Sequence, residues 1–436
     1  MSKKISLLEA IAMAVGTMIG ASIFSIFGVG AKIAGHNLPE AFILSGVFAF
    51  LVAYSYGKLG AKIVSNAGPI AFILKGIGDN IFTGALSILM WLSYVVSISL
   101  FAKGFTGYFL PLFHFPLTAF SAGITEIVLI AFFTALNFFG SKAVGKVEFY
   151  IVFVKLSILG LFILLGSLTI HSSYIVPSFN ARGINGIVNA AIIFFLSYMG
   201  FGLVTNASEN MENPRKNVPK AIYISIAVVM FVYVAVALVA IGNLTIPQLI
   251  KAQDNALAVA ARPFLGSFGF ILISVGALFS ISSALNATIY GGANISYSLA
   301  KDGELPELFE RKVWFKSTEG LYITAALGLV FAIFFNISAI ASITSGIFTM
   351  IYIFVLFSHI RLINRKIVEG QVLFVGFNLV VMMIIFLALL FYQWQTQKSA
   401  FYGLLLTLLG ALLVEFIYRN AKRRKFKNVR PYHENS

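Results

Sequence analysis

The chain has 436 residues, of which 59% are hydrophobic and 11% are charged, and its formal net charge is +15. Its mean hydropathy is +0.93, so it lacks the polar surface that a water-soluble protein of this length must show, and lipid must be its main solvent. The basic residues stand between long apolar runs rather than on one face, which argues against a nucleic-acid binder. The chain has no cysteine, which excludes a disulfide framework, a thiolate nucleophile and a cysteine metal site.

Runs of about 20 apolar residues, long enough to cross a bilayer as helices, recur along the whole chain. The first opens near the N-terminus and is too long for a signal-peptide core, so we expect a retained membrane helix. The sequence predicts an all-α integral membrane protein with 12 transmembrane helices. The spans lie near 5–34, 38–64, 83–110, 120–139, 147–170, 184–208, 218–241, 264–299, 321–335, 340–360, 372–392 and 402–418.

The distribution of lysine and arginine predicts the orientation of these spans. If the N-terminus lies inside, 24 of the 31 basic residues fall in cytoplasmic segments, six, among them Lys103, fall outside, and Lys155 falls within a span. Cytoplasmic loops carry the excess of basic residues, so we expect a protein of the cytoplasmic membrane with both termini in the cytoplasm. The basic tail, 419–436, is interpreted as a topology anchor, with binding of anionic lipid as the alternative.

Clusters of small residues interrupt two of the otherwise bulky spans. The first span carries GTMIGASIF at 16–24 and the sixth carries SYMGFG at 197–202. One cluster alone indicates close helix packing, whereas two at equivalent depth favour broken helices that line a cavity. Because the clusters lie five spans apart, we predict a five-plus-five inverted repeat, 1–170 and 184–360, followed by two more spans in 372–418.

A broken helix offers N–H groups at a positive dipole end and carbonyl groups at a negative one. A zwitterion carries the complementary charges, so the backbone alone can hold a carboxylate and an ammonium at the bilayer midplane. The sequence therefore indicates a carrier for a small amphoteric solute.

Lys155 is a charged residue deep within the fifth predicted span. It follows Lys146 by nine residues, which is roughly 13 Å along a helix. A lysine at the bilayer centre costs about 2.5–3.5 kcal/mol on insertion scales, so we interpret Lys155 as a functional residue that faces the bundle interior. Desolvation favours its neutral form, which would let it load and release a proton. The alternative is a snorkelling or structural lysine paired with helix carbonyls.

Other polar residues give weaker signals. The five histidines, among them His359, fall in loops, at span ends or in the tail, and their scatter argues against a haem or metal site. Several glutamates, among them Glu126 and Glu415, lie near span ends, where solvation at the interface is the common explanation and gating contacts are the alternative. The eighth span is rich in hydroxyl groups, among them Ser280, which indicates either hydrogen bonding between helices or a polar path.

Three segments carry a resemblance to a known family: MIGASIF at 18–24, ENPRKNVP at 212–219 and KDGELP at 301–306. With them, nearly the whole chain resembles the amino acid–polyamine–organocation superfamily of transporters, and the second segment is the most specific. GSKAVG at 140–145 and Lys155 are similar to archaeal proton-coupled amino acid transporters of this superfamily.

The resemblance implies a LeuT-like fold whose first and sixth helices bind the amino acid. The residues around Gly20, Ala21 and Ser22 would hold the carboxylate, and carbonyl groups of both helices would accept the ammonium. The implied substrate-binding residues are Met18, Ile19, Gly20, Ala21, Ser22, Leu196, Ser197 and Met199. Where sodium-coupled relatives bind a cation, the Lys155 ammonium would lie near the Gly16 carbonyl and Ser280, and these three would couple transport to protons.

The sequence departs from the family pattern at two places. The usual Gly-Ser-Gly triplet of the first helix reads Gly20-Ala21-Ser22 here, so we expect backbone capture of the carboxylate rather than a hydroxyl contact. Some exchangers of the superfamily carry a glutamate in the sixth helix where this chain has Gly202, and the gating role of that glutamate cannot operate here.

The leading hypothesis is proton-coupled amino acid uptake by alternating access, with an amino acid, a proton and membrane lipid as partners and with no cofactor. An amino acid exchanger without proton coupling is the alternative. A membrane-embedded enzyme acting on lipid is more distant, because such an enzyme needs acidic or histidine clusters for metal binding or acid–base work. The predicted spans carry no such cluster.

Overall fold

The computed structural model describes residues 4–65, 67–137, 144–301, 303, 305–313 and 317–422. The regular elements within these ranges are helices, beside two isolated β-bridges. The α-helices are α1 (Leu7–Ser25), α2 (Phe27–Ala34), α3 (Leu38–Lys62), α4 (Pro69–Ile77), α5 (Ile81–Leu112), α6 (Ala119–Leu136), α7 (Val144–Ser167), α8 (Ala181–Phe194), α9 (Leu203–Asn206), α10 (Pro214–Asn243), α11 (Ile246–Ala252), α12 (Ala256–Ala260), α13 (Arg262–Lys301), α14 (Glu319–Phe334), α15 (Ile337–Asn364), α16 (Val372–Thr396) and α17 (Lys398–Lys422). The 3₁₀ helices are η1 (Gly35–Asn37), η4 (Ser172–Tyr174), η5 (Phe195–Gly202), η6 (Ser208–Asn210), η7 (Gln253–Asn255) and η8 (Glu307–Phe309).

Among the described residues, 11 helical segments are long and apolar enough to cross a membrane. A further apolar helix, α14, has 16 residues and corresponds to the ninth predicted span. The all-α membrane class predicted from the sequence is therefore confirmed. The count of twelve spans and the five-plus-five repeat stay predictions, and residues 423–436 of the predicted basic tail lie outside the described residues.

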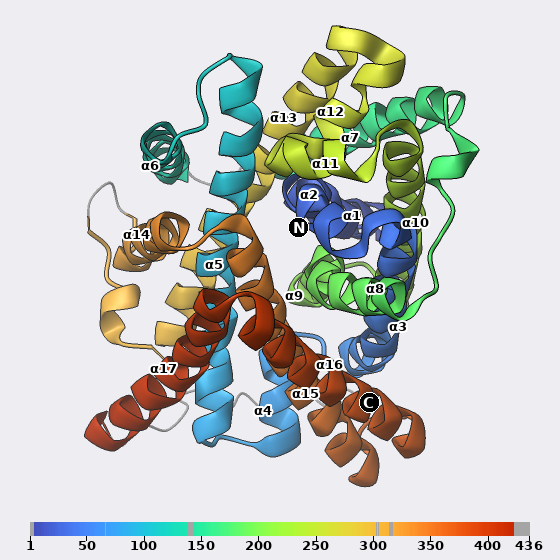
Figure 1. Ribbon diagram of the computed structural model, residues 1–436. Coiled ribbons are helices and arrows are strands. Elements are labelled where there is room, and N and C mark those ends of the chain that lie inside the picture. The colour runs from blue at the N-terminus through green and yellow to red at the C-terminus, as the bar shows by residue number, and fades with distance from the viewer. Residues whose placement is uncertain are drawn as a thin grey trace.

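The bundle has a buried interior and an apolar periphery. Figure 1 shows α5 running through the bundle with α6 set to one side. In an apolar stretch of 18 residues, 83% of the residues of α5 are buried but only 22% of those of α6. On the outer helices α16 and α17, Leu373 and Leu406 are 88% and 71% exposed. Large exposed apolar side chains on peripheral helices are what a surface in contact with lipid requires.

The first predicted span forms two helices rather than one. α1 and α2 lie in the middle of the bundle (Figure 1), where α1 contacts α5, α7, α10, α13 and η5. The helices meet at Ile26, whose φ of −114° and ψ of 7° leave the helical region. The predicted break of the first span is therefore present, but at Ile26 rather than within 16–24, because the segment 16–24 is helical. Its small residues serve close packing instead: a Cβ on Gly20 would lie 3.0 Å from the Ala284 Cβ of α13.

The sixth predicted span changes its helix type where the sequence predicts an interruption. After α8, the eight residues of η5 form a 3₁₀ helix, and the chain then returns to an α-helix in α9. Runs of 3₁₀ helix longer than three or four residues are uncommon, and inside a longer helix they often mark a functional hinge. The interruption of the sixth span is confirmed, as a tightened rather than an unwound helix.

Candidate functional site

Three backbone carbonyls of α1 accept hydrogen bonds from side chains of three other helices. The Lys155 Nζ of α7 donates to the Gly16 oxygen at 2.5 Å, and the Ser280 hydroxyl of α13 donates to the Gly20 oxygen at 2.7 Å. The Tyr233 hydroxyl of α10 donates to the Met18 oxygen. With 3.6 residues per turn, positions 16 and 20 share one face of α1, and position 18 lies on the other. The small-residue segment is thus held on both sides.

Lys155 is inside the bundle, as its predicted depth in the span requires. It is 2% exposed, and its ammonium lies against α1 through the bond to Gly16. Burying an ammonium is unfavourable unless it is hydrogen-bonded, and a charge-assisted bond is stronger than a neutral one. The bond between Lys155 and Gly16 therefore depends on the protonation of the lysine.

The other face of α1 packs against η5. A Cβ on Gly200 would lie 2.8 Å from the Met18 Cγ and 2.9 Å from the Met18 nitrogen, so only glycine lets the two backbones approach this closely. The Ser197 carbonyl of η5 lies 3.2 Å from the same Tyr233 hydroxyl that bonds Met18. Ser197 itself is 1% exposed, and its own hydroxyl has no hydrogen-bond partner among the described residues.

The remaining sequence-predicted residues lie beside these contacts. Ile19 is fully buried in α1, and Leu196 and Met199 are each 7% exposed in η5. The side chains of Ala21 and Ser22 lie outside the described residues, although the backbone there belongs to α1. The structure thus brings Gly16 to Lys155, Gly20 to Ser280, and Met18 to Ser197.

Tyr233 is the residue of this site that the sequence did not predict. It is fully buried in α10 and belongs to an aromatic cluster. Its ring centroid lies 5.2 Å from that of Phe42 and 5.4 Å from that of Tyr198, and Phe42 stacks on Phe194 at 4.1 Å. The cluster links α10 to α3 and to the start of η5. A tyrosine in an apolar helix gives no signal that separates it from ordinary core residues.

A second group of charges lies between α5, α6 and η7. The Lys103 ammonium is 3.3 Å from the Glu126 Oε1, and Glu126 is 2% exposed. Asp254 of η7 packs against α5, where a Cβ on Gly107 would lie 2.4 Å from the Asp254 Cβ. Burial, with a smaller contribution from Glu126, raises the pKa of Asp254 to about 6, and Lys103 opposes this. The expectation that Glu126 is solvated at the interface is wrong, because Glu126 is buried and pairs with Lys103 of α5.

Two further polar residues are buried near helix ends. Glu415 of α17 is fully buried, 3.6 Å from Arg419 one turn further on, so its predicted interfacial solvation is also wrong. His359 of α15 is fully buried, with its Nδ1 2.8 Å from the Ser55 hydroxyl of α3. Both residues pack inside the bundle rather than at its surface.

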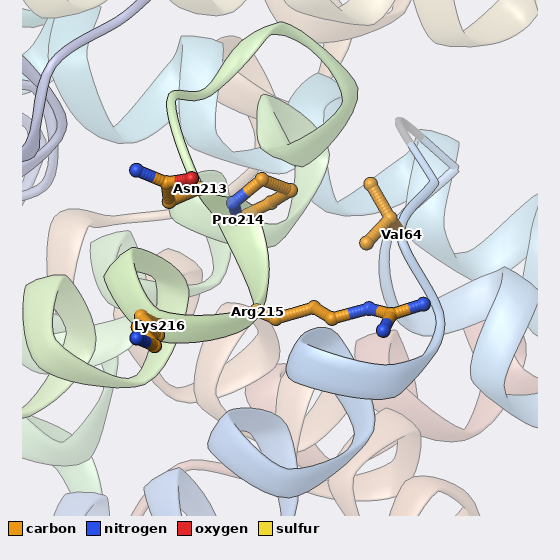
Figure 2. A pocket seen from close by; sticks show the side chains of 5 residues that line it. All are labelled: Val64, Asn213, Pro214, Arg215 and Lys216. Carbon is orange, nitrogen blue, oxygen red and sulfur yellow. The ribbon is translucent and has the colours of Figure 1, made fainter. Parts of the chain in front are cut away.

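The most specific motif of the resemblance opens α10 beside a cavity of about 380 Å³. Asn213 has a φ of 42°, a left-handed conformation that asparagine tolerates, and Pro214 follows it at the first helical position. Figure 2 shows Arg215 reaching across toward Val64, just after α3. The motif shapes the junction between α3 and α10.

The same region connects the sixth span to α1. Asn210 accepts a hydrogen bond from the Ile5 N–H at 2.8 Å, and the Glu212 N–H donates to the Ile5 oxygen at 2.9 Å. The segment that leads into α1 is therefore paired with the segment that leads out of η5 and α9.

Comparisons with known proteins agree with this architecture. A family model described as amino acid permease matches residues 5–418. An uncharacterized protein of Methanocaldococcus jannaschii is 67% identical over 427 residues, which cover 98% of each chain. The inner membrane transport protein YbaT of Escherichia coli is 31% identical over 428 residues, 97% of each chain. The branched-chain amino acid permease BcaP of Lactococcus lactis is 24% identical over 449 residues, 96% of this chain and 94% of the relative. The chain therefore belongs to the amino acid permease family, and it is a multi-pass membrane transporter rather than an enzyme.

Proposed function

We propose that this transporter takes up amino acids together with protons by alternating access. The observation that carries the proposal is that one short segment of α1 is contacted on both faces. Lys155 and Ser280 bond its carbonyls on one face, and Tyr233 and η5 contact it on the other. A group that changes its protonation and a segment of suitable backbone for a zwitterion thus act on the same helix.

In this proposal the substrate lies between α1 and η5. Its ammonium is accepted by carbonyls of Met18 and Ser197. Its carboxylate is held by the backbone around Gly20, whose N–H groups are engaged within α1 in this arrangement and become free when the segment unwinds. Backbone groups recognise the part that all amino acids share, so the side-chain preference comes from the neighbouring helices. Membership of the amino acid permease family and the likeness to a branched-chain amino acid permease of Lactococcus lactis support an amino acid as the cargo.

Lys155 supplies the coupling. When protonated, it makes a charge-assisted bond to the Gly16 carbonyl, which is worth about 1.5–3 kcal/mol; a neutral amine would make a bond of about 0.5–1.5 kcal/mol. Loss of the proton therefore weakens the attachment of α1 to α7 by roughly 1 kcal/mol, a population shift of about fivefold between two arrangements of the helices. The membrane potential and the proton gradient would act by changing the fraction of Lys155 that is protonated, and with it the strength of its bond to Gly16.

Uptake into proteoliposomes tests the proposal. Wild-type protein should concentrate labelled L-alanine, L-leucine, L-lysine or L-glutamate when an inward proton gradient is imposed, and less so without it. Lys155→Gln should keep downhill uptake but lose accumulation driven by the gradient, whereas Lys251→Ala, an exposed lysine of α11, should behave as wild type.

Two outcomes contradict this coupling mechanism. If Lys155→Gln still accumulates amino acids in response to the gradient, Lys155 is a structural lysine. If wild-type vesicles take up label only when preloaded with amino acid, whatever the gradient, the protein is an exchanger.

We also place both termini in the cytoplasm, on the basis of the charge distribution. Because the chain contains no cysteine, a single cysteine introduced at Ser2 is a unique reporter. In intact cells it should resist a membrane-impermeant thiol reagent, while a cysteine introduced at Lys398 should react. The reverse pattern contradicts the orientation.

A further inference from the structure

The Tyr233 hydroxyl lies between two backbone carbonyls from different halves of the chain. It bonds the Met18 oxygen of α1 and lies 3.2 Å from the Ser197 oxygen of η5. Tyr233 is fully buried and Ser197 is 1% exposed. A donor at the position of the Tyr233 hydroxyl oxygen can therefore reach both the Met18 and the Ser197 carbonyl.

A phenol does not satisfy such a pair well. It has one proton and can donate fully to only one of the two carbonyls. A primary ammonium has three N–H groups, and its charge strengthens each bond it makes. The pair of carbonyls is therefore matched to an ammonium better than to the hydroxyl that contacts it.

We propose that the Tyr233 hydroxyl competes with the substrate ammonium for the carbonyls of Met18 and Ser197. This inference rests on the proposed function and adds the residue that controls access to the ammonium subsite. On binding, the ammonium takes over both carbonyls and the hydroxyl withdraws. The buried Ser197 hydroxyl, which lacks a partner among the described residues, is on the same residue as one of these carbonyls.

Withdrawal of the hydroxyl has consequences beyond the subsite. The Tyr233 ring packs against Phe42 of α3 and Tyr198 of η5, and Phe42 stacks on Phe194 at the end of α8. A shift of the Tyr233 ring therefore displaces Phe42 of α3 and Tyr198 of η5, and through Phe42 it reaches Phe194 of α8. Substrate binding is thereby connected to the helices that surround α1.

The geometry also defines a class of substrate. Replacing the hydroxyl at both carbonyls requires at least two N–H groups, which primary and secondary ammonium groups have and a quaternary ammonium lacks. The transporter should therefore prefer amino acids with a primary ammonium, accept N-methyl derivatives less well and reject N,N,N-trimethyl derivatives.

Binding measurements on purified protein test the competition. Tyr233→Phe removes the competitor and keeps the ring, so the Kd for the best bound of L-alanine, L-leucine, L-lysine and L-glutamate should fall about three- to tenfold, the value of one neutral hydrogen bond. Tyr418→Phe is the matched control: it removes a hydroxyl of α17 that also donates to a backbone carbonyl, that of Leu305 at 3.2 Å, and should leave the Kd unchanged.

Several results would overturn the inference. If Tyr233→Phe weakens binding, the hydroxyl contacts the substrate instead of competing with it; a Kd equal to that of wild type removes any role. A test that needs no variant is the N-methyl series of the same amino acid: undiminished binding of the trimethyl derivative by wild-type protein contradicts the ammonium subsite. Wild-type protein that binds none of the four amino acids contradicts the proposed function as well.

Discussion

The two faces of α1 differ in the chemistry of the groups that hold them. Toward α7 and α13, its carbonyls accept hydrogen bonds from the Lys155 ammonium and the Ser280 hydroxyl. Toward α10 and η5, they accept from the neutral Tyr233 phenol, and the glycine at position 200 brings a second backbone into contact. One face thus depends on a titratable group, and the other depends on close packing.

This difference indicates a division of labour. A change of protonation acts on the first face through the strength of one bond, while a ligand that bonds backbone carbonyls acts on the second. The carbonyls of Gly16 and Met18 are only two residues apart on α1. Protonation of Lys155 therefore changes the affinity for the ligand, and binding of the ligand changes the affinity of Lys155 for its proton. Such reciprocity is what coupling between two sites requires.

The largest effect is expected from Gly200→Ala on the η5 face. The added Cβ would lie 2.9 Å from the Met18 backbone nitrogen, which cannot move aside as a flexible side chain can. The substitution pushes η5 away from α1, and a displacement of this size at a binding site should lower the initial rate of uptake roughly 10- to 100-fold.

Gly202→Ala is the matched control, in the last position of the same 3₁₀ helix. Its Cβ would have an ordinary contact with the Tyr56 ring at 3.8 Å, so uptake should stay close to wild type. Equal losses in the two variants would show that η5 needs glycine for its own conformation, and the packing difference between the two faces would no longer hold.

A smaller effect is expected on the other face from Ser280→Ala. The variant removes the donor to the Gly20 carbonyl, a bond worth about 1 kcal/mol, so uptake should fall about fivefold. Ser274→Ala is the control, because Ser274 is also buried in α13 and its hydroxyl has no partner among the described residues. A loss as large in Ser274→Ala would assign the effect to packing of α13 rather than to the bond.

The sequence predicts one face better than the other, and the reason is physical. Lys155 stands out because a charge in an apolar run is expensive, and its depth in the span follows from counting residues. Tyr233 does not stand out, because the contact that matters joins it to Met18, 215 positions away, and a tyrosine in an apolar helix is ordinary. Hydropathy reports burial; it does not report which buried hydroxyl meets which carbonyl.

The same limit explains the errors at helix ends and breaks. Glu126 lies near a predicted span end, and only the arrangement of α5 and α6 reveals its partner Lys103. The small residues at 16–24 permit either a broken helix or close packing, and the choice depends on neighbours such as Ala284. In η5 the backbone changes its helix type at a comparable cluster, so small residues mark the place of a special contact without specifying its form.

The smallest effect on transport is expected from a substitution at Asp254 of η7, whose titration is separate from that of Lys155. Its pKa of about 6 lies above the ordinary 3.8, so the folded protein favours the neutral carboxyl. The stability contributed by this group is therefore present at low pH and is lost as the pH rises through about 4 to 6. Asp254→Asn cannot ionise and should be more stable than wild type at pH 8, by about 1–3 kcal/mol.

Thermal unfolding in detergent between pH 4 and pH 8 measures this difference. The gain of Asp254→Asn should shrink toward zero at pH 4, whereas a gain of constant size would mean that the substitution acts through packing against α5. In transport, the variant removes the titration of η7 and keeps the residues that bond the carbonyls of α1, Lys155, Ser280 and Tyr233. The dependence of uptake on the proton gradient should then persist in Asp254→Asn and disappear in Lys155→Gln, because only the second substitution alters the titratable face of α1.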